Sequence, residues 1–157
     1  MNFSQALLWG FAATVVLTTL LSGSRALGFT RMDIPFMLGT MFTGNRDRAK
    51  WLGFFFHLFN GWIFSLIYIA AFHSTGWNNL WFGAAIGLVH ALFVLVVGMR
   101  VLPSIHPRMA SEQHGPDPTR QLEPPGFLAR NYGARTPVVS ILAHLIFGGI
   151  LGFFYHA

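Results

Sequence analysis

Four stretches of this chain are long and apolar enough to cross a lipid bilayer as α-helices. One crossing takes roughly 20 mostly apolar residues, and we place the four at residues 4–22, 51–72, 81–101 and 137–156. None contains Asp, Glu or Lys, and their only arginine, Arg100, lies at the end of the third. Because these stretches use most of the 157 residues, we predict an all-α, polytopic membrane protein that forms a single domain. We expect its four transmembrane helices to form two tandem helical hairpins.

The basic residues predict how the chain lies in the membrane. All ten Lys and Arg residues fall within residues 25–50 or 100–135, whereas both termini and residues 73–80 have none. Basic loops remain on the cytoplasmic side of a membrane, so we predict that both termini lie outside. The net charge of +5 then reflects topology and contact with anionic lipid headgroups, and we expect the lipid bilayer rather than nucleic acid as the partner.

Residues 31–43 form a mostly apolar segment that is too short to cross the bilayer. Asp33 suits a helix N-cap, Pro35 suits a first turn, and Gly44 suits a C-terminal stop. We predict a short helix that lies in the cytoplasmic interface or dips into the membrane as a re-entrant segment. Asp33 is chiefly its cap, and the alternative is a functional carboxylate at the cytoplasmic mouth of the protein.

Residues 102–135 form the one long connection, and they contain six of the eight prolines. This composition resists packing, so we predict an extended or disordered cytoplasmic loop, of which residues 126–133 form the ordered, interfacial end. Two histidines of this loop, His106 and His114, do not match a zinc-binding spacing. We expect both to be solvated.

Two of the predicted spans carry the same short pattern. Residues 57–68 and 144–155 share His, Leu, Gly, Ile and Tyr at matched places. The starts of the other two spans, Trp9-Gly-Phe-Ala-Ala and Trp81-Phe-Gly-Ala-Ala, match more loosely. These matches predict two hairpins related by a pseudo-twofold axis along the membrane normal, as in transporters with parallel repeats.

The same two spans each carry a stripe of small residues interrupted by one histidine. Positions four apart share one face of a helix, and small residues at this spacing let membrane helices approach closely. We therefore predict that the two stripes face each other, or face equivalent partner helices, across the pseudo-axis. The stripes consist of Gly53, His57, Gly61 and Ser65, and of Ser140, His144, Gly148 and Gly152.

Ionisable side chains inside membrane spans are candidate functional residues. His57, His144 and His90, with the nearby amide of Asn60, are the candidates here. One interpretation is structural, since a neutral imidazole can tie helices together by hydrogen bonds. A second is a haem b or a metal ion held by His57 and His144, with or without His90. A third is a proton or small-solute path, because histidine titrates near neutral pH.

One combination of motifs resembles a known type of protein. The motifs are Met32-Asp-Ile-Pro-x-Met-Leu-Gly, then Gly53-x-x-x-His57-x-x-x-Gly61, and residues 144–155. Together they resemble small bacterial inner-membrane proteins of the YagU-like type, whose function is unknown. The resemblance implies a four-helix protein of the bacterial inner membrane with a shared His-x-x-x-Gly packing element, and it implies no catalytic residues.

The spans carry little chemistry beyond histidine, and cysteine is absent from the chain. We therefore predict a non-catalytic accessory or structural subunit of a larger membrane complex, or a homo-oligomer. Its partners would be other membrane subunits or copies of itself. The alternatives are a haem- or metal-binding redox protein that uses the buried histidines, and a small transporter or proton-linked channel.

Overall fold

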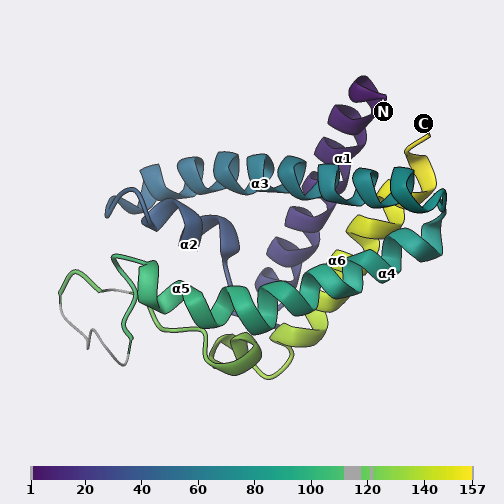
Figure 1. The fold of residues 1–157 in the computed structure, drawn as a ribbon. Helices are drawn as coiled ribbons and strands as arrows, with labels where there is room; N and C mark the ends of the chain where they lie inside the picture. The colour runs from purple at the N-terminus through teal and green to yellow at the C-terminus, as the bar shows by residue number, and fades with distance from the viewer. Residues whose placement is uncertain (1, 112–117, 121, 157) are drawn as a thin grey trace.

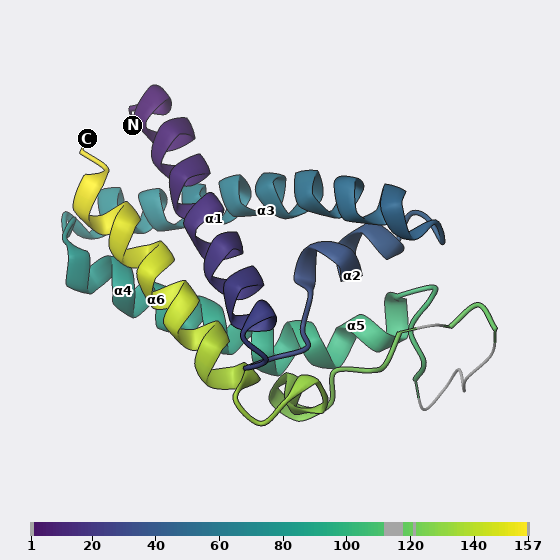
Figure 2. The same cartoon turned by 180° about the vertical axis from the view of Figure 1, so that it is seen from behind.

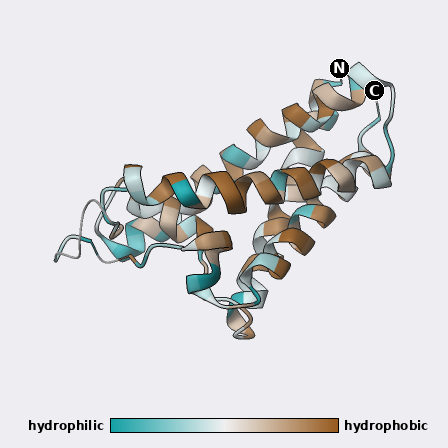
Figure 3. Cartoon of the chain, turned by 60° about the horizontal axis from the view of Figure 1, so that its bottom comes forward, coloured by the Kyte–Doolittle hydropathy of each residue, from teal (hydrophilic) through white to brown (hydrophobic). Residues whose placement is uncertain are grey.

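The computed structural model describes residues 2–111, 118–120 and 122–156, and these residues form an all-helical structure. Four helices are long and apolar enough to cross a membrane, as predicted: α1 (Phe3–Ala26), α3 (Arg46–Thr75), the continuous helix Leu80–Ile105, and α6 (Thr136–Phe154). The third of these consists of α4 (Leu80–Leu92), a π-helical turn η1 (Phe93–Gly98) and α5 (Met99–Ile105). Hydrophobic residues run along the long helices, and hydrophilic ones gather at their ends and in the loops (Figure 3).

Asparagine caps start three of the long helices. The side chains of Asn2, Asn45 and Asn79 accept hydrogen bonds from backbone N–H groups in the first turns of α1, α3 and α4. Such caps satisfy N–H groups that have no partner within the helix. At the other end of α3, Gly76 adopts φ 71° and stops the helix, because a left-handed residue at this position is tolerated best by glycine.

The helices cross rather than forming a parallel bundle. From the turn at Gly76, α3 and the helix α4–α5 diverge (Figure 1), while α1 and α6 lie beside each other and cross both (Figure 2). α4 packs along α6, and α1 packs against both α3 and α6. The main core lies at these crossings, with the fully buried side chains of Tyr68, Phe147 and Tyr155 among its members.

The two small-residue stripes do not face each other, so the first form of that prediction was wrong. A Cβ added at Gly61 would lie 2.0 Å from Oγ1 of Thr14 in α1, and one added at Gly148 would lie 2.0 Å from the carbonyl oxygen of Gly83 in α4. Each stripe therefore contacts a different helix, α1 or α4. The pseudo-twofold relation between two hairpins remains a prediction. Gly53 contacts a third element, because its Cβ would lie 1.6 Å from the carbonyl oxygen of Pro35.

The short helix α2 (Ile34–Thr40) supplies that third contact. Asp33 caps it as predicted, its Oδ1 accepting a hydrogen bond of 3.1 Å from the N–H of Phe36. The helix ends at Thr40, before the predicted stop at Gly44, and its backbone lies directly against α3. Its place at a membrane interface remains a prediction.

Both termini and the α3–α4 turn meet at one end of the molecule (Figure 1). The hydroxyl of Tyr155 accepts a hydrogen bond of 3.2 Å from the N–H of Asn2 and lies 2.9 Å from Nε2 of His73. The amide of Asn78 donates to the carbonyl oxygen of Tyr155. This end has no Lys or Arg in the sequence, and the side of a membrane that it faces remains a prediction.

The described parts of the proline-rich loop pack against the helices, which is contrary to our prediction before residue 126 and consistent with the ordered segment that we predicted at 126–133. His106 is only 4% exposed, and Met109, Ala129 and Tyr132 are buried with Met32, Met37, Leu95 and Met99 in a second core cluster. Burial of the apolar residues between the prolines therefore orders these parts of the loop, although the proline-rich composition favours an extended chain. His114 lies outside the described residues.

His106 is buried and hydrogen-bonded, and not solvated as we expected; we call its hydrogen bonds, with those of Arg108, the His106 clamp. Its Nε2 donates to the carbonyl oxygen of Met37 at 2.9 Å, and its Nδ1 accepts from the N–H of Arg108 at 3.1 Å. The guanidinium of Arg108 also donates to the carbonyl oxygen of Thr40 at 2.7 Å. These bonds hold the end of α5 against α2.

The His106 clamp predicts an acid-sensitive fold. Burial lowers the pKa of His106 from 6.5; the hydrogen bond to Met37 opposes this shift and the charge of Arg108 adds to it. The unfolded chain then binds the proton more readily, so this contribution to stability is present above pH 6.5 and is lost as the pH falls. We expect the unfolding free energy of His106→Gln to fall less steeply between pH 8 and pH 5 than that of the wild type.

Thermal or denaturant unfolding in mild detergent at several pH values measures this difference. At pH 8, His106→Gln should be less stable by about 1–3 kcal/mol, because buried hydrogen bonds are lost. His156→Gln, which changes an exposed histidine at the other end, is the control and should retain the wild-type slope. Equal slopes in wild type and His106→Gln would contradict the clamp.

Candidate functional site

A cavity of about 270 Å³ lies between the long helices and is lined by residues from all of them and from α2. We call it the histidine cavity. Its apolar lining includes Leu17 and Leu21 of α1 and Met99 of α5. Its polar side chains are the four residues predicted as a candidate site, together with one member of a small-residue stripe: His57, Asn60, His90, His144 and Ser140.

Thr18 of α1 orients the imidazole of His57. The two side chains are 3.0 Å apart, from Oγ1 to Nδ1, and the Thr18 hydroxyl lies 2.7 Å from the carbonyl oxygen of Thr14. A hydroxyl has one proton, which it donates to Thr14, so its oxygen accepts from the Nδ1–H of His57. The neutral imidazole then carries a free lone pair on Nε2.

His144 has the same tautomer for a different reason. Its Nδ1 lies 2.7 Å from the carbonyl oxygen of Ser140, one turn earlier in α6. A carbonyl oxygen only accepts hydrogen bonds, so Nδ1 carries the proton and Nε2 has the lone pair. The sequence spacing of four residues thus places the imidazole and its orienting group on one helix face.

His90 joins the other two histidines from α4. Its Nδ1 lies 3.1 Å from the hydroxyl of Tyr68 in α3, and its ring stacks on Phe64 with centroids 4.0 Å apart. Its ring also meets that of His144 edge to face, at a centroid distance of 4.7 Å. The histidines therefore connect α3 to α1, α3 to α4, and α4 to α6, which agrees with the structural interpretation of these residues.

Each imidazole nevertheless uses only one nitrogen in these contacts. Within the described chain, Nε2 of His57, His90 and His144 and the amide of Asn60 have no hydrogen-bond partner, and the only fully buried side-chain atom without one is Ser140 Oγ. The three Nε2 atoms are thus not fully buried, and each remains accessible from the cavity. Because these side chains line the histidine cavity, their free polar groups are available to an occupant.

The described part of the chain fits a three-ligand metal ion poorly. Among the residues that the structure describes, no group of three or more His, Asp or Glu side chains could hold a metal ion. The direct contact of the His90 and His144 rings leaves no room for a flat macrocycle between those two rings, whereas the pair that we predicted as haem ligands is His57 and His144. The cavity volume also lies just below the range of about 300–1,000 Å³ typical of pockets for drug-sized ligands.

Three groups that orient or line the site were not predicted. Tyr68 stands in the repeated pattern at residues 57–68, where a tyrosine inside an apolar span was the available signal. Thr18 carries no distinguishing signal among the apolar residues of α1. The π-helical turn, in which the N–H of Met99 bonds to the carbonyl oxygen of Val94, lines the cavity with Phe93, Val94 and Gly98. Such turns are frequent at functional sites.

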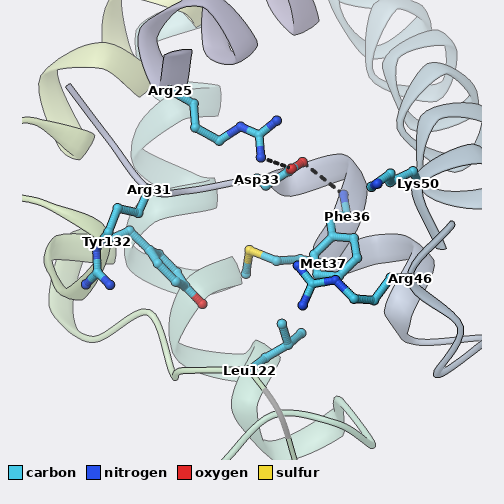
Figure 4. Close-up of a pocket in the computed structure, with 9 residues that line it drawn as sticks. All are labelled: Arg25, Arg31, Asp33, Phe36, Met37, Arg46, Lys50, Leu122 and Tyr132. Atoms are coloured by element: carbon cyan, nitrogen blue, oxygen red, sulfur yellow. Dashed lines mark hydrogen bonds and ion pairs between the residues drawn. The ribbon is translucent and has the colours of Figure 1, made fainter. Parts of the chain in front are cut away.

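A second pocket of about 310 Å³, which we call the basic pocket, lies beside α2 and the start of α3 (Figure 4). Asp33 lines it, and its carboxylate forms an ion pair of 2.6 Å with Arg25. Tyr132 also lines it and donates a hydrogen bond to the carbonyl oxygen of Glu123. Burial and the nearby Glu123 carboxylate raise the pKa of Tyr132 to about 12, so this hydroxyl remains protonated at neutral pH.

Comparisons of the chain with known protein families, curated proteins and solved structures found no match. The function is therefore inferred from the two cavities and from the membrane-spanning character of the helices.

Proposed function

We propose that this protein is a non-catalytic membrane subunit that holds a small amphiphile from the bilayer in the histidine cavity. One observation carries the proposal: three histidines from three different helices line one cavity, each with Nδ1 engaged and Nε2 without a protein partner in the described chain. Orientation of an imidazole through one nitrogen, with the other left for a ligand, is the usual arrangement of functional histidines.

The chemistry of the cavity defines the occupant. Nε2 of His57 and of His144 accept hydrogen bonds, and the amide of Asn60 can donate and accept. Most of the remaining lining is apolar. An apolar molecule with a hydroxyl group matches this combination, since an unmatched buried polar group costs about 1–3 kcal/mol. We propose binding rather than catalysis because, among the residues that the structure describes, imidazole, amide and hydroxyl groups make up the polar lining and no carboxylate joins them.

The wider setting belongs to the same proposal. We infer an accessory subunit of a larger complex, or a homo-oligomer, in a bacterial inner membrane with both termini outside. What supports self-association or a partner subunit is the exposure of large side chains on the long helices, including Phe55, Phe59 and Val89, which contact lipid or other helices. Chemical cross-linking in native membranes tests this part. A protein that is cross-linked neither to a second copy of itself nor to another subunit would contradict it.

The binding proposal is tested on protein extracted gently from its own membrane. Small molecules bound to wild type, His57→Leu and His144→Leu are identified by mass spectrometry, with His156→Leu as the exposed control. We expect one amphiphile in wild type and control, reduced at least tenfold in both cavity variants. Equal content in all four proteins would overturn the proposal.

A cavity-filling variant separates binding from folding. A Cβ added at Gly98 would meet only the carbonyl oxygen of Phe93, at 3.9 Å, and Gly98 lines the histidine cavity. Gly98→Leu therefore keeps all three histidines and removes volume, and it should also lose the amphiphile. An absorption spectrum of the same preparations tests the haem alternative. A Soret band in the wild type that is lost in His57→Leu or His144→Leu would show that the ligand of the cavity is haem and not an amphiphile.

A further inference from the structure

The basic pocket brings four cationic side chains from separate parts of the chain to one place. Arg25 lies in the last turn of α1, Arg31 precedes α2, and Arg46 and Lys50 lie in the first turns of α3. In Figure 4, Arg46 and Lys50 reach from α3 toward Phe36 and Asp33. Among the described residues that line the pocket, Asp33 is the one carboxylate.

The carboxylates that the structure describes around the pocket leave one of these cations, Arg46, without an ion pair. Asp33 is paired with Arg25, while the ion pairs of Lys50 with Asp47 and of Arg31 with Glu123, both 3.2 Å long, lie at exposed positions. Exposed ion pairs are weak and exchange readily. In the described chain Arg46 has no ion pair, and its guanidinium lies over the Phe36 ring, 5.2 Å from the centroid. An anion can therefore bind Arg46 and Lys50 while the Arg25–Asp33 pair stays intact.

The basic pocket and the histidine cavity share a lining residue. Met37 lines both the basic pocket and the histidine cavity. Around it, Met32, Ile34, Leu38 and Met99 line the histidine cavity. Unbranched methionine side chains adapt to irregular apolar groups, so this border suits a flexible hydrocarbon chain. A cationic pocket on one side of Met37 and an apolar cavity on the other match a molecule with an anionic head and an apolar tail.

We propose that the basic pocket binds the phosphate group of an anionic lipid, one apolar chain of which enters the histidine cavity. The entry of the chain rests on the proposed function, whereas the binding of the phosphate does not. The basic end of the molecule would lie at headgroup level, because basic residues adjoining membrane helices are attracted to anionic headgroups. Arginine and lysine are also the side chains that bind phosphate most strongly.

Lipid binding to the full chain in mild detergent tests the headgroup part. Native mass spectrometry compares dioleoylphosphatidic acid with dioleoylphosphatidylcholine, which has the same chains and no net charge. We expect wild type to prefer the anionic lipid at least tenfold, and Arg46→Gln and Lys50→Gln each to reduce that preference about tenfold. Arg48→Gln, which removes an exposed arginine between them that does not line the pocket, is the matched control and should keep the preference.

Three results would overturn the proposal. The first is equal binding of the two lipids, and the second is an equal loss in Arg48→Gln, which would indicate a diffuse surface charge. The third is full displacement of the anionic lipid by an equimolar amount of inorganic phosphate, which would make free phosphate the ligand. Helix content measured by circular dichroism confirms that each variant is folded.

The variants also separate this inference from the proposed function. Gly98→Leu should weaken binding of both dioleoyl lipids, because it fills the cavity that takes the chain. His57→Leu and His144→Leu should leave dioleoyl binding intact while losing the amphiphile of the proposed function, because an oleoyl chain has no hydroxyl group for the imidazoles. Arg46→Gln should change only the preference for the anionic headgroup. If Arg46→Gln loses the preference for the anionic lipid but still binds both lipids, the site has the two parts that we propose. If Arg46→Gln keeps the preference, the basic pocket is not the phosphate site, and the proposal for the histidine cavity is unaffected.

Discussion

Replacing Gly148 with alanine is expected to force α6 away from α4, whereas the same change at the adjacent Gly149 is expected to leave the fold intact. A Cβ at Gly148 would lie 2.0 Å from the carbonyl oxygen of Gly83 and 2.9 Å from the ring of Tyr68. At Gly149 the closest atom would be Cγ of Leu80, at 3.8 Å, which is an ordinary contact. The two positions are thus glycines of the same helix, and they differ in the room available for a Cβ atom.

The effect should be large because backbone atoms cannot move aside as a flexible side chain can. Overpacking typically costs about 1–3 kcal/mol, and we expect Gly148→Ala to lie at the upper end or beyond. Gly149→Ala should change the unfolding free energy by less than about 1 kcal/mol, within the difference in helix propensity between the two residues. Unfolding of both variants in detergent measures this contrast, and equal destabilisation would show that α4 and α6 do not cross at Gly148.

Gly148→Ala should also disturb the candidate site. His144 lies one turn before Gly148 in α6, and its ring contacts that of His90 in α4. Separation of the two helices would pull these imidazoles apart and open the histidine cavity. The amphiphile that we propose should therefore be lost from Gly148→Ala and retained in Gly149→Ala.

Replacing Gly53 with alanine is expected to release α2 from α3. Its Cβ would lie 1.6 Å from the carbonyl oxygen of Pro35 and 2.9 Å from the nitrogen of Gly39. The main core at the helix crossings lies elsewhere, so the expected result is a local rather than a global change. Hydrogen exchange over residues 34–40 should rise at least tenfold, which corresponds to about 1.4 kcal/mol of local opening.

Both proposed binding functions depend on this contact. Met37 of α2 lines the histidine cavity and the basic pocket, so Gly53→Ala should weaken binding of dioleoylphosphatidic acid. Gly23→Ala in α1 is the control, because a Cβ there would meet no atom within 4 Å. Unchanged exchange over α2 in Gly53→Ala, or a similar rise in Gly23→Ala, would contradict the direct backbone contact.

Much of the candidate site could be predicted because a histidine inside an apolar span stands out. His57, His90, His144 and Asn60 were named from the sequence, and the structure brings all four to one cavity. The partners that orient the imidazoles could not be named in the same way. The hydroxyl of Thr18 acts through its position on a neighbouring helix, which depends on how α1 crosses α3.

The loops were predicted less well for a related reason. Composition describes the average preference of a segment, whereas burial depends on particular neighbours. His106 is buried because the carbonyl oxygen of Met37 and the N–H of Arg108 match both of its nitrogens. These partners come from separate segments, and the many prolines of the loop gave the opposite signal.

The sequence alone determined the four apolar helices, the end of the molecule at which the basic residues collect, and the histidines that carry the site. These features follow from local composition, because each apolar stretch satisfies its own backbone hydrogen bonds as a helix. Only the tertiary structure decided which helices the glycine stripes contact, where α2 packs and how the two cavities adjoin at Met37. Small residues permit close approach on any helix, and the partner is selected only when the complete set of crossings is packed together.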